Sequence, residues 1–93
     1  MAATSKAVVT VLGFDRKGII ACVSNVLYEG GINILEISQT IVDGFFNMLM
    51  IVDLSEPTCS FDELQDRLTK LGDEVGVQIR IQKREIFEAM HQI

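Results

Sequence analysis

The sequence predicts a ferredoxin-like α+β fold, a two-layer sandwich in which a four-stranded antiparallel sheet carries two helices on one face. The first observation behind it is the order of hydrophobic periods, which reads strand, helix, strand, strand, helix, strand. The second is an Asp-Gly pair between the two central strands, which is typical of a tight hairpin. The third is the length of 93 residues, which suits one small domain. Right-handed crossovers then place both helices on the same side of the sheet.

The first strand and helix follow from a change of period near residue 13. A continuous apolar run at residues 7–12, ended by Gly13, predicts a buried strand. Apolar residues then recur at three- and four-residue spacing, which predicts a helix with Asp15 as a candidate cap and Gly30-Gly31 as its end. The apolar positions of this helix are Ile19, Ile20, Val23, Val26 and Leu27.

The two central strands are predicted at residues 34–42 and 45–54, on either side of Asp43-Gly44. Apolar and polar residues alternate in the strand predicted at 34–42, so its side chains are expected to point to opposite faces of the sheet. One side is expected to hold Leu35, Ile37 and Ile41, and the other Glu36, Ser38 and Thr40.

The second helix is expected to begin at Ser60, because Ser60 and Glu63 have the spacing of a capping box. Its apolar face consists of Phe61, Leu64, Leu68 and Leu71, and Gly72 is expected to end it. The last strand is predicted from the alternating residues Val75, Val77, Ile79 and Ile81.

A final amphipathic segment follows this fold. Ile86, Phe87, Met90 and Ile93 recur at helical spacing, which predicts a short helix at residues 84–93. A helix of about ten residues is unstable alone and must dock on a surface. The whole chain, 1–93, is therefore predicted to be a single domain with its core at 6–83 and this helix at its C-terminal end.

The strands carry more apolar residues than one helix-covered face needs. The first strand has Val8 and Leu12 opposite its other apolar residues. The third has Phe45, Leu49 and Ile51 opposite Phe46, Met48, Met50, Val52 and Leu54. An exposed apolar face usually marks an interface. We therefore expect a homodimer or a higher homo-oligomer formed by the sheet face, with the terminal helix as a second cover. The alternative is that the terminal helix alone covers this face.

Composition excludes several classes of protein. The net charge of -5 opposes binding to nucleic acid phosphates, and no apolar run reaches the roughly 18 residues of a membrane span. Cys22 and Cys59 have no CxxC spacing and no neighbouring histidine, so no metal site or cofactor is expected. We expect a cytoplasmic protein that binds neither nucleic acid nor membrane.

The segment from Gly13 to Ile19 is the strongest candidate for a ligand site. Gly13 and Gly18 permit a tight turn, and the following helix directs free N–H groups and a positive dipole toward the loop. Arg16 and Lys17 add positive charge, so a carboxylate is the natural ligand. The alternative is a capped turn with two solvated basic residues. Asn33 is a second candidate, since its amide can donate and accept at the start of a strand, although a simple turn residue would look the same.

The loop Gly13-Phe14-Asp15-Arg16-Lys17-Gly18-Ile19, followed by Gly31-Ile32-Asn33-Ile34, resembles the ACT domain. The loop is similar to that of the glycine cleavage system repressor type, and the whole chain resembles an uncharacterised family of free-standing single ACT-domain proteins. The resemblance implies a regulatory module that binds an amino acid between subunits, near this loop and the start of the second strand. Lys17 departs from better-known relatives, several of which carry Pro there. The residues that match the family's site are Gly13, Asp15, Lys17, Gly18, Ile19, Asn33 and Ile34.

Catalysis is not expected. The single histidine, His91, lies in the terminal segment, and Cys59 has no neighbouring histidine that could act as its base. Two functions remain. In the first, the protein is a small-molecule-sensing regulator that binds an amino acid or similar carboxylate effector at a subunit interface and acts on an unknown target protein. In the second, it is a ligand-independent interaction or oligomerisation module that acts on a partner enzyme or transporter.

Overall fold

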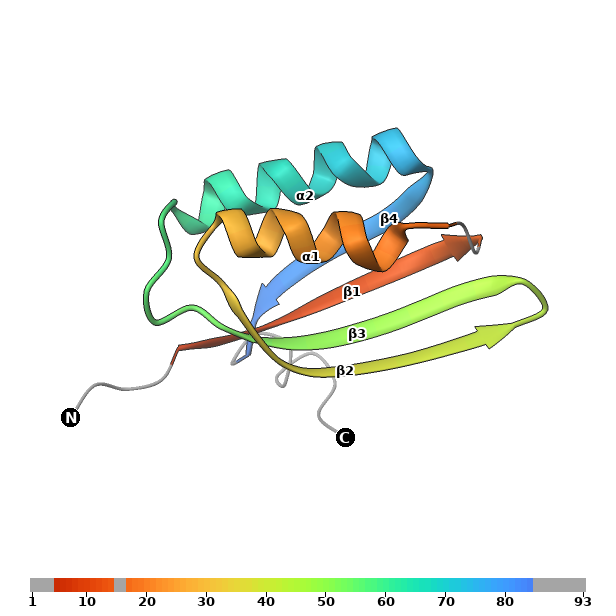
Figure 1. The fold of residues 1–93 in the computed structure, drawn as a ribbon, viewed down its shortest axis with the longest axis horizontal. Coiled ribbons are helices and arrows are strands. Elements are labelled where there is room, and N and C mark those ends of the chain that lie inside the picture. The colour runs from red at the N-terminus through yellow and green to blue at the C-terminus, as the bar shows by residue number, and fades with distance from the viewer. Residues whose placement is uncertain (1–4, 15–16, 85–93) are drawn as a thin grey trace.

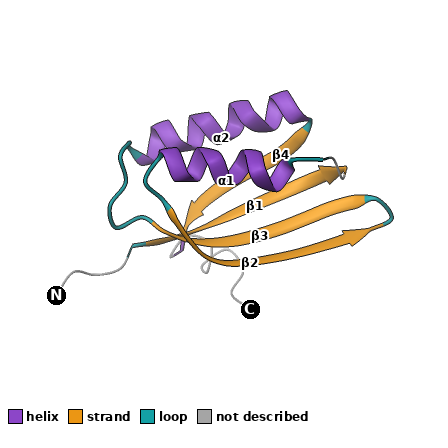
Figure 2. Cartoon of the chain, viewed as in Figure 1, coloured by secondary structure: helices purple, strands orange, loops and turns teal. Residues whose placement is uncertain are grey.

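The predicted ferredoxin-like fold is confirmed in the computed structural model, which describes residues 5–14 and 17–84. The sheet has the order β2-β3-β1-β4, and every neighbouring pair is antiparallel. Figure 2 shows both helices as one layer on a single face of the strands. The elements are β1 (Lys6–Phe14), α1 (Ile19–Glu29), β2 (Asn33–Val42), β3 (Phe45–Asp53), α2 (Phe61–Val75) and β4 (Val77–Lys83). The predicted terminal helix lies outside the described residues, apart from its first residue, Arg84.

The core lies between the helices and one face of the sheet. Alternate residues of the strands point toward the helices, as a pleated sheet requires. The buried strand residues are Ala7, Val9, Val11, Phe46, Met48, Met50, Val52, Val77, Ile79 and Ile81, and they pack against Ile19, Val23 and Leu27 of α1 and Leu64 and Leu68 of α2. Phe46 and the methionines of β3 are therefore part of this core. The apolar residues predicted on the opposite side of β1 and β3 lie outside it, namely Val8, Leu12, Phe45, Leu49 and Ile51.

Helix α1 is bounded by glycines at both ends. Its N-cap is Gly18, in the left-handed region at φ 82°, so Asp15 was the wrong choice of cap; Asp15 itself lies outside the described residues. The C-terminal end at Gly30-Gly31 is confirmed. There Gly31 N–H donates to the Tyr28 carbonyl at 3.0 Å and Ile32 N–H to that of Leu27 at 2.9 Å, which is a Schellman motif.

Helix α2 begins as predicted and ends later than predicted. The Ser60 hydroxyl accepts from Glu63 N–H at 3.1 Å, and the Glu63 carboxylate accepts from Ser60 N–H at 3.3 Å, which confirms the capping box. The helix continues through Gly72 to Val75 and is capped by Gly76 at φ 78°. The predicted end at Gly72 was wrong because this glycine serves close packing: a Cβ there would lie 2.6 Å from the Val77 carbonyl oxygen of β4.

The β2–β3 hairpin turns at Asp43-Gly44, as predicted. Both residues have positive φ, 54° and 76°, which is the signature of a type I′ turn. The predicted sides of β2 were wrong at Leu35, because a β-bulge between Ile34 and Glu36 shifts the register. Ile37 and Ile41 pair with buried core residues of β3, whereas Leu35 lines a hollow on the opposite side, together with Glu36.

We predict that Gly72→Ala destabilises the protein, although alanine is favoured over glycine in a helix by about 1 kcal/mol. The added methyl group would press on the backbone of β4, and overpacking of this kind costs about 1–3 kcal/mol. Urea denaturation measures the change, with Asp73→Ala on the exposed side of α2 as a control. A Gly72→Ala protein as stable as the wild type would show that the two layers do not depend on this contact.

Candidate functional site

The first group of predicted site residues lies where β1 passes into α1. This loop group consists of Gly13, Lys17, Gly18 and Ile19; Asp15 and Arg16 lie outside the described residues. Ile19 is buried in the core, and Lys17 and Gly18 are exposed. Cys22 N–H donates to the Gly18 carbonyl at 2.9 Å as the first bond of α1, so the N–H groups between them have no partner within the helix. The exposed Lys17 ammonium is therefore close in sequence to the N-terminus of α1, which is the positive end of its helix dipole.

Two glycines give the loop its path. A Cβ on Gly13 would lie 2.8 Å from Cγ1 of Val77, so Gly13 allows β1 to pack closely on β4. A Cβ on Gly18 would meet nothing within 4 Å, so Gly18 is required instead for its positive φ. These two constraints set the direction in which the loop leaves the sheet.

The second group, called the strand group, consists of Asn33 and Ile34 at the start of β2. Asn33 is exposed and pairs with Asp53 of β3, while Ile34 pairs with Val52 and is partly buried against the core. The chain just before this group is held by Thr58. Its N–H donates to the Gly30 carbonyl at 2.8 Å, and its hydroxyl to the Glu29 carbonyl at 2.8 Å.

The loop group and the strand group lie at opposite ends of the sheet. Asn33 is level with Asp53, which is level with Lys6 at the start of β1, whereas the loop follows the far end of β1 (Figure 1). Gly13 follows Lys6 by seven residue steps along the strand, which correspond to about 23 Å. A single small ligand therefore cannot touch both groups of the same chain.

Asp53 is a polar neighbour of the strand group that the sequence alone did not reveal. The Ser55 hydroxyl and the Ser55 N–H donate to its Oδ1 at 2.5 and 2.9 Å. These hydrogen bonds, followed by the charge of Lys6, lower the pKa of the Asp53 carboxyl below its ordinary value. A carboxylate thus stands across from the Asn33 amide. The Asp-Leu-Ser sequence indicates a local turn, but only the strand register brings Asp53 beside Asn33.

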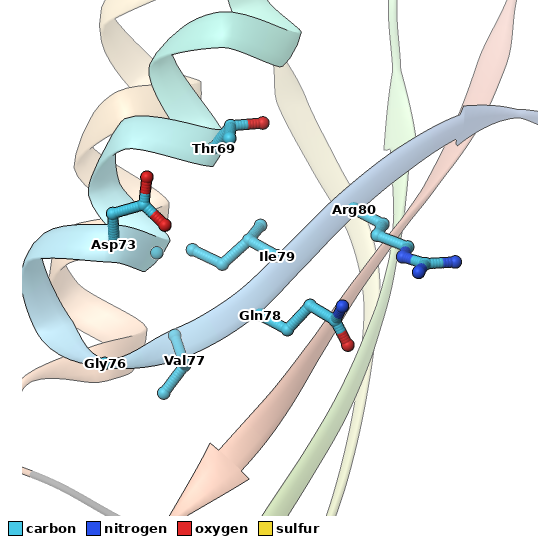
Figure 3. Close-up of a pocket in the computed structure, with 8 residues that line it drawn as sticks. Thr69, Asp73, Gly76, Val77, Gln78, Ile79 and Arg80 are labelled. Atoms are coloured by element: carbon cyan, nitrogen blue, oxygen red, sulfur yellow. The ribbon is translucent and has the colours of Figure 1, made fainter.

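A hollow of about 530 Å³ lies between α2 and β4, and Figure 3 shows the residues that line it. Thr69 and Asp73 approach it from the helix, on the same side as Ile79. Gln78 and Arg80 point to the other face of β4. Because these polar groups do not converge on one point, the hollow does not form a polar ligand site.

A second hollow, of about 310 Å³, lies on the open face, which is the sheet face turned away from α1 and α2. We call it the open-face groove. Its lining combines apolar and charged side chains. The apolar ones are Val8, Leu35, Leu49 and Ile51, and the charged ones are Lys6, Glu36 and Arg84.

The described residues offer no site for a metal and no helix that could span a membrane. Within residues 5–14 and 17–84, no group of His, Cys, Asp and Glu side chains is placed to hold a metal ion. Over the same residues, no helix has both the length and the apolar character that a membrane crossing requires. Cys22 and Cys59 are free thiols and are half-buried.

Comparisons with other sequences cover almost the whole chain. A UPF0237 protein of Listeria innocua is 52% identical over 88 residues, which make up 95% of this chain and 99% of the relative. A UPF0237 protein of the archaeon Methanocaldococcus jannaschii is 49% identical over 89 residues, or 96% of this chain and 99% of the relative. The predicted resemblance to free-standing single-domain proteins is therefore confirmed.

Solved structures share the fold. An ACT domain protein from Streptococcus pneumoniae superposes with a TM-score of 0.79 at 40% identity, over 96% of this chain and 100% of its own. A chain assigned as a glycine cleavage system transcriptional repressor has a TM-score of 0.75 at 23% identity, over 88% of this chain and 47% of its own. The regulatory subunit of aspartate kinase from Thermus thermophilus has a TM-score of 0.65 at 24% identity, over 84% of this chain and 50% of its own. The last two similarities establish the shared fold alone.

Residues 5–82 match the ACT domain family itself. This match includes residues of all six elements of the fold, from the start of β1 to the penultimate residue of β4. The chain belongs to the ACT domain family.

Proposed function

We propose that this protein is a cytoplasmic regulator that binds an amino acid or a similar carboxylate effector between two copies of the chain. ACT domains are regulatory ligand-binding modules of amino acid metabolism, and the chain belongs to that family. One observation supports the shared site above all others. The loop group and the strand group lie at opposite ends of one sheet, so only a second copy can complete the site.

The two groups have complementary chemistry. At the loop group, the free N–H groups of α1 and the Lys17 ammonium suit a carboxylate. At the strand group, the Asn33 amide and the Asp53 carboxylate suit an ammonium group. An α-amino acid carries both charges on neighbouring atoms, and its side chain would then be selected by the surface between the two copies. Gly13, Asp15, Arg16, Gly18, Ile19 and Ile34 complete the proposed site as loop and strand neighbours of these groups.

The outer edge of β2 is the interface that best joins the two groups. Antiparallel pairing of β2 with its copy would bring the start of one β2 to the loop end of the partner's sheet. Ile37 and Ile41 are 48% and 53% exposed beside this edge, and a second copy would cover them. This dimer uses the edge of the sheet, whereas the sequence predicted its face.

A regulatory role fits the described residues better than catalysis does. The polar groups of the hollow between α2 and β4 diverge, and most residues that line the open-face groove are apolar. Effector binding would instead act by favouring one arrangement of the two copies, which an unknown target protein then recognises.

We predict that at least one of the twenty amino acids raises the thermal midpoint of the full-length protein in a concentration-dependent way. A ligand at 100 times its Kd stabilises the folded state by about 2.7 kcal/mol. Differential scanning fluorimetry at millimolar concentrations detects such a shift. Failure of all twenty amino acids, with an unchanged oligomeric mass, would favour the ligand-independent interaction module instead.

We predict that Lys17→Ala and Asn33→Ala each abolish this stabilisation, because each removes one charged or amide partner of the effector. Lys70→Ala and Asn25→Ala, at exposed positions of α2 and α1, are matched controls that should respond like the wild type. Calorimetric titration with the stabilising amino acid measures the affinities. The site is misplaced if both site variants bind as tightly as their controls.

A further inference from the structure

We propose that the C-terminal segment, residues 85–93, crosses the open face as a short amphipathic helix and seats its apolar side in the open-face groove. This inference does not depend on effector binding. It assigns a function to a segment and a hollow that the proposed regulatory site leaves unused.

The open-face groove is the enclosed part of an otherwise exposed surface. Val8 is 5% exposed there, although it points away from both helices, whereas Leu12 on the same face of β1 is 38% exposed. Leu49 and Ile51 beside Val8 are half-buried. An apolar hollow of this kind is stabilised by an apolar occupant.

The C-terminal segment has the pattern of such an occupant. At 100° per residue, its large apolar side chains fall on one side and its polar side chains on the other. The apolar side consists of Ile86, Phe87, Met90 and Ile93, and the polar side of Glu85, Glu88, His91 and Gln92. A nine-residue helix is too short to be stable in water without a surface to dock on.

The position of Arg84 and the length of the segment fit a path across the open face. Arg84 lines the groove and immediately precedes the segment, so the segment starts at the groove. Nine helical residues extend about 14 Å. The path from β4 over β1 and β3 to β2 crosses three strand spacings, which is also about 14 Å. A helix of this length therefore reaches from Arg84 to Leu35 on β2.

Tethering and charge favour this segment over a second copy of the chain. A covalently attached segment has a local concentration in the millimolar range, which a free partner rarely reaches. The groove lining holds the cations Lys6 and Arg84 against one anion, Glu36, and the segment holds Glu85 and Glu88, so the two carry net charges of opposite sign although these carboxylates lie on the polar side of the helix. A docked segment would also cover the open face, so that two copies of the chain could not associate through it. The contact between copies would then use the outer edge of β2.

The test compares two substitutions in the full-length chain that add the same charge to opposite sides of the segment. Met90→Asp places it on the apolar side and Gln92→Asp on the polar side. We expect Met90→Asp to lower the thermal midpoint by roughly 5 °C or more and to shift the methyl NMR signals of Val8, Leu49 and Ile51. Gln92→Asp should leave both unchanged. Equal behaviour of the two variants would overturn the proposal.

A second measurement on the unmutated protein identifies the occupant directly. We expect nuclear Overhauser contacts from the Met90 methyl group to the methyl groups of Val8 or Ile51 within one chain. In a mixture of labelled and unlabelled protein, contacts between chains at these methyl groups would mean that a second copy fills the groove, and the proposal would be wrong. It would equally be wrong if these groove methyl groups contacted neither the segment nor another chain.

Discussion

The crossover from β1 through α1 to β2 determines where the two groups of the proposed effector site lie. Because β3 lies between β1 and β2 and runs antiparallel to both, β1 and β2 point the same way. The loop after β1 and the start of β2 are therefore separated by the length of a strand. The ends of the sheet differ in chemistry as a result, with Lys17 and a helix N-terminus at one and Asn33 and Asp53 at the other. Two copies in antiparallel register would reunite them, and an effector held between copies can report on their arrangement.

The layers that hold these ends in place meet at Val77. Gly72 of α2 lies against the Val77 carbonyl, and Gly13 of β1 lies against the Val77 side chain. One residue of β4 thus packs closely on both α2 and the end of β1, from which the loop to α1 leaves. A side chain at Gly13 would press on Val77 beside this loop, so the position of the candidate loop depends on packing within the sheet.

Local patterns in the sequence predicted most of the fold. The hairpin at Asp43-Gly44 and the capping box at Ser60 each depend on residues close together in the sequence, so a local pattern is enough to predict them. Gly72 was misread because its reason is a contact with β4, which no local pattern contains. Leu35 was placed on the wrong side because alternation assumes a regular strand, and the bulge appears only in the pairing with β3. Asp53 was missed for the same reason, since its neighbour Asn33 lies on another strand. The loop pattern and the Asn33 amide indicated most of the candidate site residues, and the family resemblance agreed with them, but their separation in one chain became clear only from the topology.

The central claim, that one site takes Lys17 from one copy and Asn33 from the other, is tested most directly by mixing the two variants. Chains carrying Lys17→Ala and chains carrying Asn33→Ala are co-expressed with different tags, and effector binding is measured by calorimetry. Each variant alone should not bind. In the mixture, half of the dimers are hybrids, and each hybrid has one intact site, so binding capacity should return to about one quarter of the wild-type value. No recovery in dimers that demonstrably exchange chains would contradict the shared site.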